Sequence, residues 1–164
     1  MSISYFERIL SDIRWCAAAK DLAELQEFCV SRIAESLPHY NWVGFYMLDI
    51  SDPDVLVLGP FHGAPTEHVR IPVTQGICGA AVAQGKAIIV EDVTSDPRYL
   101  ACSLETKSEI VVPIRVDGQI VCEIDIDSHS RSAFGGEDRV FLEECAAIVG
   151  QFIAQHPGEG QREK

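Results

Sequence analysis

Apolar residues recur at helical spacing in two stretches near the start of the chain and in one at its end. In residues 4–19 they are Phe6, Ile9, Ile13 and Cys16, and in the stretch that follows they are Leu22, Leu25, Cys29 and Ile33. In residues 137–155 they are Leu142, Cys145, Val149 and Phe152. We therefore expect two amphipathic helices first, the second ended by Pro38, and one long helix last.

Between these stretches the pattern changes to short runs of β-branched and aromatic residues, which predict strands. The expected strands are residues 40–48, 55–58, 69–73, 87–90, 110–116 and 120–126, with a short helix at 76–83. Gly59-Pro60 is expected to break the chain, and Asp117-Gly118 predicts a tight hairpin. Residues 92–107 have no clear period, so we expect a long functional loop there. Together these elements favour an α+β class, an antiparallel sheet covered by helices on one face.

The last predicted strand alternates strictly between apolar and acidic positions. One face carries Ile120, Cys122, Ile124 and Ile126, and the other carries Val121, Glu123, Asp125 and Asp127. A row of carboxylates is unfavourable unless water, a cation or hydrogen bonds offset its charge. Two interpretations stay open: a solvated face, or a pocket wall that receives a ligand ammonium. A calcium loop fits less well because residues 125–129 lack the glycine and the third oxygen ligand, so no metal is expected.

Length, charge and cysteine usage narrow the class of protein. With 164 residues we expect a single domain over residues 1–155 and a frayed polar tail over 156–164. A net charge of −12 argues against partners that are nucleic acids or anionic membranes. Six cysteines without an export signal or regular spacing favour reduced thiols in the cytoplasm.

The cysteines divide into two groups. Cys16, Cys29, Cys122 and Cys145 lie on apolar faces of predicted elements, where a thiol behaves as a small hydrophobic group. Cys78 and Cys102 belong to no apolar period. Cys78 falls in the first turn of a predicted helix, where unsatisfied N–H groups should lower the thiol pKa. Spacing alone leaves both a functional and an inert role open for these two cysteines.

Seven short motifs in one order carry a family resemblance. They are Asn-Trp-Val-Gly-Phe-Tyr at 41–46, Leu-Gly-Pro-Phe at 58–61, Val-Arg-Ile-Pro-Val at 69–73, Gly-Ile-Cys-Gly at 76–79, Ala-Cys at 101–102, Ser-Glu-Ile-Val at 108–111 and Asp-Ile-Asp-Ser at 125–128. Together they resemble the GAF-domain free methionine-(R)-sulfoxide reductases over residues 41–149. The resemblance implies a GAF-like fold, with a six-stranded antiparallel sheet, helices packed on one face and a ligand pocket on the other. It also implies a homodimer.

The resemblance further implies a thiol-dependent reduction and assigns roles to residues. Cys102 would be the attacking thiol, with Glu109, Asp125 and Asp127 as pocket acids and Trp42 and Tyr46 as an aromatic wall. Carboxylates would hold the ligand ammonium while a protonated Glu109 donates to the sulfoxide oxygen. Cys102 would become a sulfenic acid, and a second cysteine would form a disulfide with it. Thioredoxin or another dithiol would then reopen the bridge, with no bound cofactor.

The chain departs from the family pattern at three places. His68 replaces the usual resolving cysteine, which leaves Cys78 as the candidate for that role. Glu123 adds a negative charge where the family has an apolar residue, and Lys107 replaces a small polar one. These changes keep alternatives open: a GAF module that binds a small molecule or senses redox state without catalysis, or a reversible switch between Cys78 and Cys102.

Overall fold

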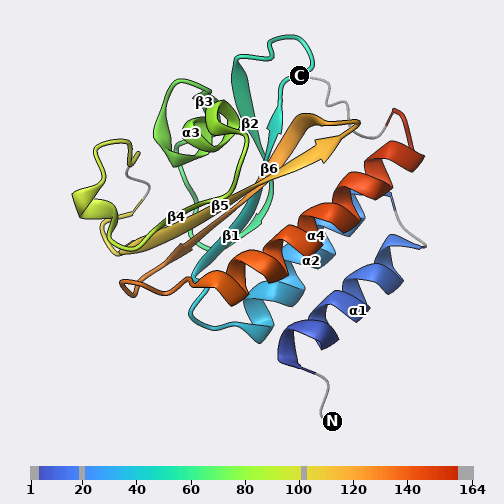
Figure 1. The fold of residues 1–164 in the computed structure, drawn as a ribbon, viewed down its shortest axis with the longest axis horizontal. Coiled ribbons are helices and arrows are strands. Elements are labelled where there is room, and N and C mark those ends of the chain that lie inside the picture. Colours follow the sequence, from blue (N-terminus) through green and yellow to red (C-terminus); the bar gives the residue numbers. More distant parts are fainter. Residues whose placement is uncertain (1–3, 19–20, 101–102, 159–164) are drawn as a thin grey trace.

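The computed structural model describes residues 4–18, 21–100 and 103–158. Its helices are α1 (Tyr5–Ala17), α2 (Leu22–Ser36), α3 (Gly76–Gln84), the short 3-10 helix η1 (Val93–Ser95) and α4 (Gly136–Gln155). Its strands are β1 (Trp42–Leu48), β2 (Val55–His62), β3 (Arg70–Pro72), β4 (Ile88–Val90), β5 (Ser108–Val116) and β6 (Gln119–Ser128). The strands form one six-stranded sheet in the order β3-β2-β1-β6-β5-β4, with antiparallel neighbours throughout (Figure 1).

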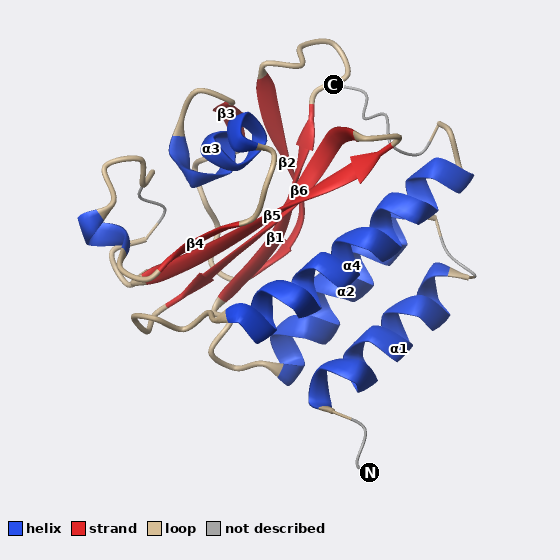
Figure 2. Cartoon of the chain, viewed as in Figure 1, coloured by secondary structure: helices blue, strands red, loops and turns tan. Residues whose placement is uncertain are grey.

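The helices are distributed unequally over the two faces of the sheet. Helices α2 and α4 lie along one face, and α1 packs against both of them as an outer layer (Figure 2). The other face carries α3, which contacts both edge strands, β3 and β4, as well as β5 and β6 (Figure 1). The large helical layer therefore leaves the second face of β1, β5 and β6 to form a site together with α3.

The predicted helices are confirmed, and local capping explains where they begin. The hydroxyl oxygen of Ser4 accepts a hydrogen bond from the backbone N–H of Glu7 at 3.2 Å, and a carboxyl oxygen of Asp21 accepts one from the N–H of Glu24 at 2.9 Å. The apolar stripe of the long last helix is buried as expected, in the core between the helices and the sheet. Of the predicted tail, His156 stacks on Phe152, and residues 159–164 lie outside the described part of the chain.

The prediction that Gly59-Pro60 breaks the chain is wrong. Strand β2 continues through both residues to His62. The register explains how, because Gly44 of β1 faces Phe61 while Tyr46 faces Leu58. Two residues of β2 therefore oppose one of β1, a bulge that accepts a proline without a ladder hydrogen bond. In the loop over residues 92–107, the sequence pattern also missed η1.

The hairpin of β5 and β6 separates two apolar cores. Asp117 and Gly118 have φ angles of 52° and 79°, as a tight hairpin turn with two left-handed residues requires. Along β6 the alternation is confirmed from residue 122 onward, since Cys122, Ile124 and Ile126 lie in the larger core beneath the helices. It is wrong for Val121, which packs against that same core because the register with β5 shifts there. The smaller core, on the α3 side, includes Tyr46, Cys78 and Val111. The acidic positions of β6 therefore point to the side of the smaller core.

No helix within residues 4–18, 21–100 and 103–158 has the length and apolar character needed to cross a membrane.

Candidate functional site

Four acidic side chains are buried on the pocket face of β5 and β6. They are Glu109, Glu123, Asp125 and Asp127, and each is at most 4% exposed. Strand pairing gathers them, because Glu109 of β5 lies directly opposite Asp127 of β6 and the β6 acids alternate along one strand. The solvated interpretation of this face is therefore wrong, and the acids line an enclosed site.

Helix α3 brings Cys78 to these carboxyl groups. The Sγ atom of Cys78 and one carboxyl oxygen each of Glu109 and Asp125 all lie within 4.8 Å of one another. Gly79 allows the helix to sit this deep, because a Cβ there would lie 2.5 Å from the carbonyl oxygen of Val73. The structure thus joins Cys78 to two acids that are 31 and 47 positions away in the sequence.

The prediction of a lowered thiol pKa at Cys78 is wrong. Burial raises the pKa of Cys78 well above its ordinary value, and the negative charges of Asp125, Glu123 and Glu109 raise it further. Cys78 does lie in the first turn of α3, but the partial charge of a helix N-terminus is small beside desolvation and nearby carboxylates. The Cys78 thiol is therefore protonated in the resting protein.

The carboxyl groups share protons with each other. Burial raises the pKa of Asp125, and a hydrogen bond from Glu109 opposes that rise by favouring the charged form of Asp125. A hydrogen bond between two carboxyl groups requires that one of them carry the proton. Burial also raises the pKa of Glu123 well above 4.5. A hydrogen bond with the Cys78 thiol opposes this rise, and the negative charge of Asp125 adds to it.

The acids line two small cavities rather than one large pocket. The first has a volume of about 20 Å³ and is lined in part by Tyr46, Cys78, Glu109 and Asp125. The second has a volume of about 90 Å³ and is lined in part by Trp42 and Asp127, together with residues of the 64–66 and 103–106 segments. Small-molecule pockets are typically at least ~300 Å³. The expected pocket sized for a free amino acid is therefore divided here, and such a ligand needs neighbouring side chains to move.

The predicted aromatic wall holds a loop against the sheet. Trp42 stacks on Tyr46 with ring centroids 6.2 Å apart, and both rings extend from β1. The Tyr46 hydroxyl donates a hydrogen bond to the carbonyl oxygen of His68 at 2.8 Å, and Trp42 Nε1 donates one to the carbonyl oxygen of Ala64 at 3.0 Å. Residues 64–66 and His68 therefore form part of the cavity walls, a role that no local pattern in the sequence indicated.

Cys102 lies outside the described residues, so its predicted role as the attacking thiol is not placed here. The described residues on either side of it do reach the site. Leu100 lines the first cavity, and Ser103 lines the second.

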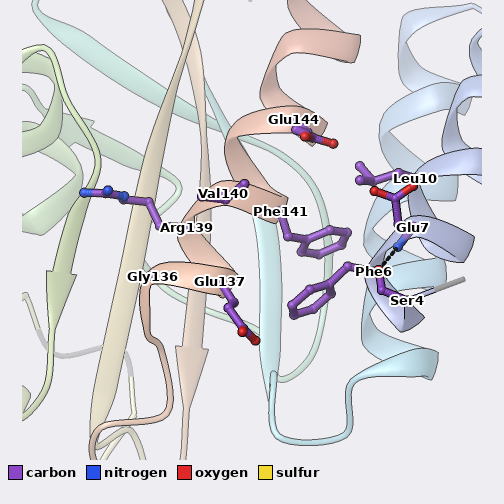
Figure 3. Close-up of a pocket in the computed structure, with 10 residues that line it drawn as sticks. All are labelled: Ser4, Phe6, Glu7, Leu10, Gly136, Glu137, Arg139, Val140, Phe141 and Glu144. Atoms are coloured by element: carbon purple, nitrogen blue, oxygen red, sulfur yellow. Dashed lines mark hydrogen bonds between the residues drawn. The ribbon is translucent and has the colours of Figure 1, made fainter. Parts of the chain in front are cut away.

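A larger hollow than these cavities lies elsewhere. A groove of about 750 Å³ runs between α1 and α4, on the far side of the helical layer from the acids. Figure 3 shows Phe6 and Phe141 facing each other in this groove while Arg139 points away. The ring centroids of Phe6 and Phe141 are 4.4 Å apart. The groove lacks a cysteine, and the chemistry of the chain is concentrated in the smaller cavities.

Comparison with known proteins identifies the family of the chain. A family model described as a GAF domain matches residues 19–154. A free methionine-R-sulfoxide reductase of Escherichia coli is 42% identical over 120 residues, which are 73% of this chain and 70% of the relative. The solved structure of a free methionine-R-sulfoxide reductase from Neisseria meningitidis in complex with its substrate has a TM-score of 0.87 and 32% identity, covering 96% of this chain and 95% of that one. The chain belongs to the GAF-domain free methionine-R-sulfoxide reductase family.

Family membership confirms the predicted GAF-like fold and the resemblance from which it came. A further relative, Protein YtsP of Bacillus subtilis, is 47% identical over 73% of this chain and 72% of its own length. The roles assigned to Cys102, Cys78 and the pocket acids stay predictions. The structure supports them to the extent that Cys78 and all three predicted acids line the two neighbouring cavities.

Proposed function

We propose that the chain reduces free methionine-(R)-sulfoxide to methionine, with Cys102 as the nucleophile. The observation that carries the proposal is the buried acidic cluster on β5 and β6, in a chain whose relatives bear the name of this activity. Free methionine sulfoxide is a zwitterion, and buried carboxylates bind an ammonium group by strong charge-assisted hydrogen bonds. A peptide-bound methionine sulfoxide has no such ammonium.

The hydrogen bond between Glu109 and Asp125 suggests a role for Glu109 as a proton donor in the reaction. We propose that Glu109 donates to the sulfoxide oxygen while the Cys102 thiolate attacks the sulfur. The sulfoxide sulfur is reduced by two electrons, methionine leaves, and Cys102 retains the oxygen as a sulfenic acid. In the same proposal, the carboxyl groups of Asp125 and Asp127 bind the ammonium.

Cys78 is the proposed resolving thiol. Its attack on the sulfenic acid releases water and leaves a Cys78–Cys102 disulfide, which thioredoxin or another dithiol reduces. Because the pKa of Cys78 is raised, this step requires that Cys78 lose its proton as it attacks. The pocket acids are the nearest groups that can accept that proton.

The proposed cellular setting rests on Cys29, Cys78, Cys122 and Cys145, which are free thiols. Free thiols fit a reducing compartment, and we propose the cytoplasm. A homodimer and a thioredoxin-like reductant belong to the same proposal.

Three assays test the function. Racemic free methionine sulfoxide with dithiothreitol should yield methionine and leave the S epimer; no methionine above a protein-free blank would refute the proposal. Cys102→Ser should abolish turnover, whereas Cys78→Ser should mainly suppress turnover with thioredoxin. Equal loss with dithiothreitol would contradict the resolving role. If the wild type is inactive and Cys102→Ser still binds free methionine sulfoxide, the chain is the non-catalytic GAF module instead.

A further inference from the structure

Three metal-ligating groups from separate parts of the chain converge on the pocket face of the sheet. The Sγ atom of Cys78 and carboxyl oxygens of Glu109 and Asp125 lie within 4.8 Å of one another, and all three residues are buried. A Zn²⁺ ion with sulfur at about 2.3 Å and oxygens at about 2.0–2.2 Å holds tetrahedral ligand atoms about 3–4 Å apart. Shifts of about 1 Å therefore bring the three groups around one ion.

The cavity beside these groups has the size of an ion site. It measures about 20 Å³ and is lined by the same three residues. A volume of this order holds about one water molecule. A single cation with one water or one oxygen ligand fits there, whereas an amino acid does not.

Glu123 provides a second and separate observation. Its side chain is 0% exposed, and within residues 4–18, 21–100 and 103–158 neither of its carboxyl oxygens has a hydrogen bond of normal geometry. It is on the same strand face as Asp125, and it interacts with the thiol of Cys78. An uncompensated buried carboxyl group is unfavourable in itself, and a cation beside it offsets that cost.

We propose that Cys78, Glu109 and Asp125 form a binding site for a borderline-soft divalent cation of the Zn²⁺ type, with Glu123 as the neighbouring charge that favours the cation. A thiolate ligand selects Zn²⁺ over Mg²⁺ and Ca²⁺, which prefer sites made of oxygen alone. The bound cation occupies the cavity where the proposed substrate ammonium binds, so the two exclude each other. That competition rests on the proposed function, whereas metal binding does not.

The direct test titrates the reduced, reductant-free protein with Cd²⁺ alone and follows the charge-transfer absorption of a cadmium–thiolate bond. Wild type should bind one equivalent with this absorption, and Zn²⁺ should displace the Cd²⁺. Cys78→Ser should lose the absorption. Cys16→Ser, the same change at a buried cysteine of the helical core, should keep it. An unchanged absorption in Cys78→Ser, or its loss in Cys102→Ser alone, would overturn the proposal.

Two carboxamide variants keep the proposal testable if Cys78→Ser does not fold. Glu109→Gln and Asp125→Asn preserve shape and remove one ligand charge each, so each should weaken Zn²⁺ binding by at least tenfold in calorimetry. Glu67→Gln, an exposed position, is the matched control and should bind as wild type does. Wild-type affinity in both folded site variants, or equal binding of Mg²⁺, would overturn the site. Absence of reductase activity would leave these titrations unaffected, so the two proposals fail separately.

Discussion

Glu123 makes the stability of the protein depend on pH in a direction that can be worked out. Burial raises the pKa of its carboxyl group well above 4.5 in the folded state, while the unfolded chain keeps the ordinary value. Between these two values the folded state binds more protons than the unfolded state, so the free energy of unfolding falls as pH rises above 4.5. Glu123→Gln keeps the size of the side chain and removes this titration.

The magnitude follows from linkage. Between the two pKa values, each unit of rising pH lowers the free energy of unfolding of the wild type by up to about 1.4 kcal/mol. In the variant, residue 123 does not titrate and makes no such contribution. The two proteins should have similar stability near pH 4.5, and Glu123→Gln should gain up to about 1.4 kcal/mol per unit above it. Urea unfolding at pH 4.5, 5.5, 6.5 and 7.5, with a metal chelator present, measures the difference.

The same carboxyl-to-amide change at an exposed position, Glu67→Gln, is the control. Asp125 also has a raised pKa, so a smaller slope should persist in Glu123→Gln itself. The reasoning would be wrong if the stability difference between Glu123→Gln and wild type stayed constant over this pH range. That result would show that burial does not raise the pKa of Glu123.

Three further substitutions test the surroundings of the site and the core by urea denaturation. Tyr46→Phe removes the hydrogen bond to the His68 carbonyl and should cost about 0.5–1.5 kcal/mol; no loss would mean that the bond does not hold the loop. Gly79→Ala places a methyl group 2.5 Å from the Val73 carbonyl oxygen and should cost about 1–3 kcal/mol, unless α3 can shift freely. Leu142→Ala, at a fully buried position, should cost about 2–5 kcal/mol, and a smaller value would indicate that the helical core collapses around the gap.

Local patterns were sufficient for the elements but not for their assembly. The alternation along β6 correctly separated Ile124 from Glu123, because side chains of a strand alternate between faces whatever the partner strands are. The insertion of β1 between β2 and β6 has no local signal, and neither has the bulge that carries Gly59-Pro60 through β2. Pairing between distant strands is set by the whole chain.

The functional site also has features that the sequence predicts and features that depend on the assembled fold. Family motifs selected the pocket acids correctly as a group that meets in space. The pKa of Cys78 was predicted in the wrong direction, because a helix position is visible in the sequence whereas the carboxyl groups facing it from β5 and β6 are not. The role of residues 64–68 depends on hydrogen bonds from two rings of β1, which likewise cannot be deduced from spacing.

The two-sided character of β6 has a consequence for how this protein can change. At the odd-numbered positions of the strand, Asp125 and Asp127 line the cavities and Glu123 is buried on the same face. The even-numbered positions from 122 to 126 fill the helical core. Substitutions at the odd positions can therefore alter ligand preference without repacking the helices. Insertion or deletion of a single residue would exchange the two sets and bury carboxylates among isoleucines, so the length of this strand should tolerate far less variation than its composition.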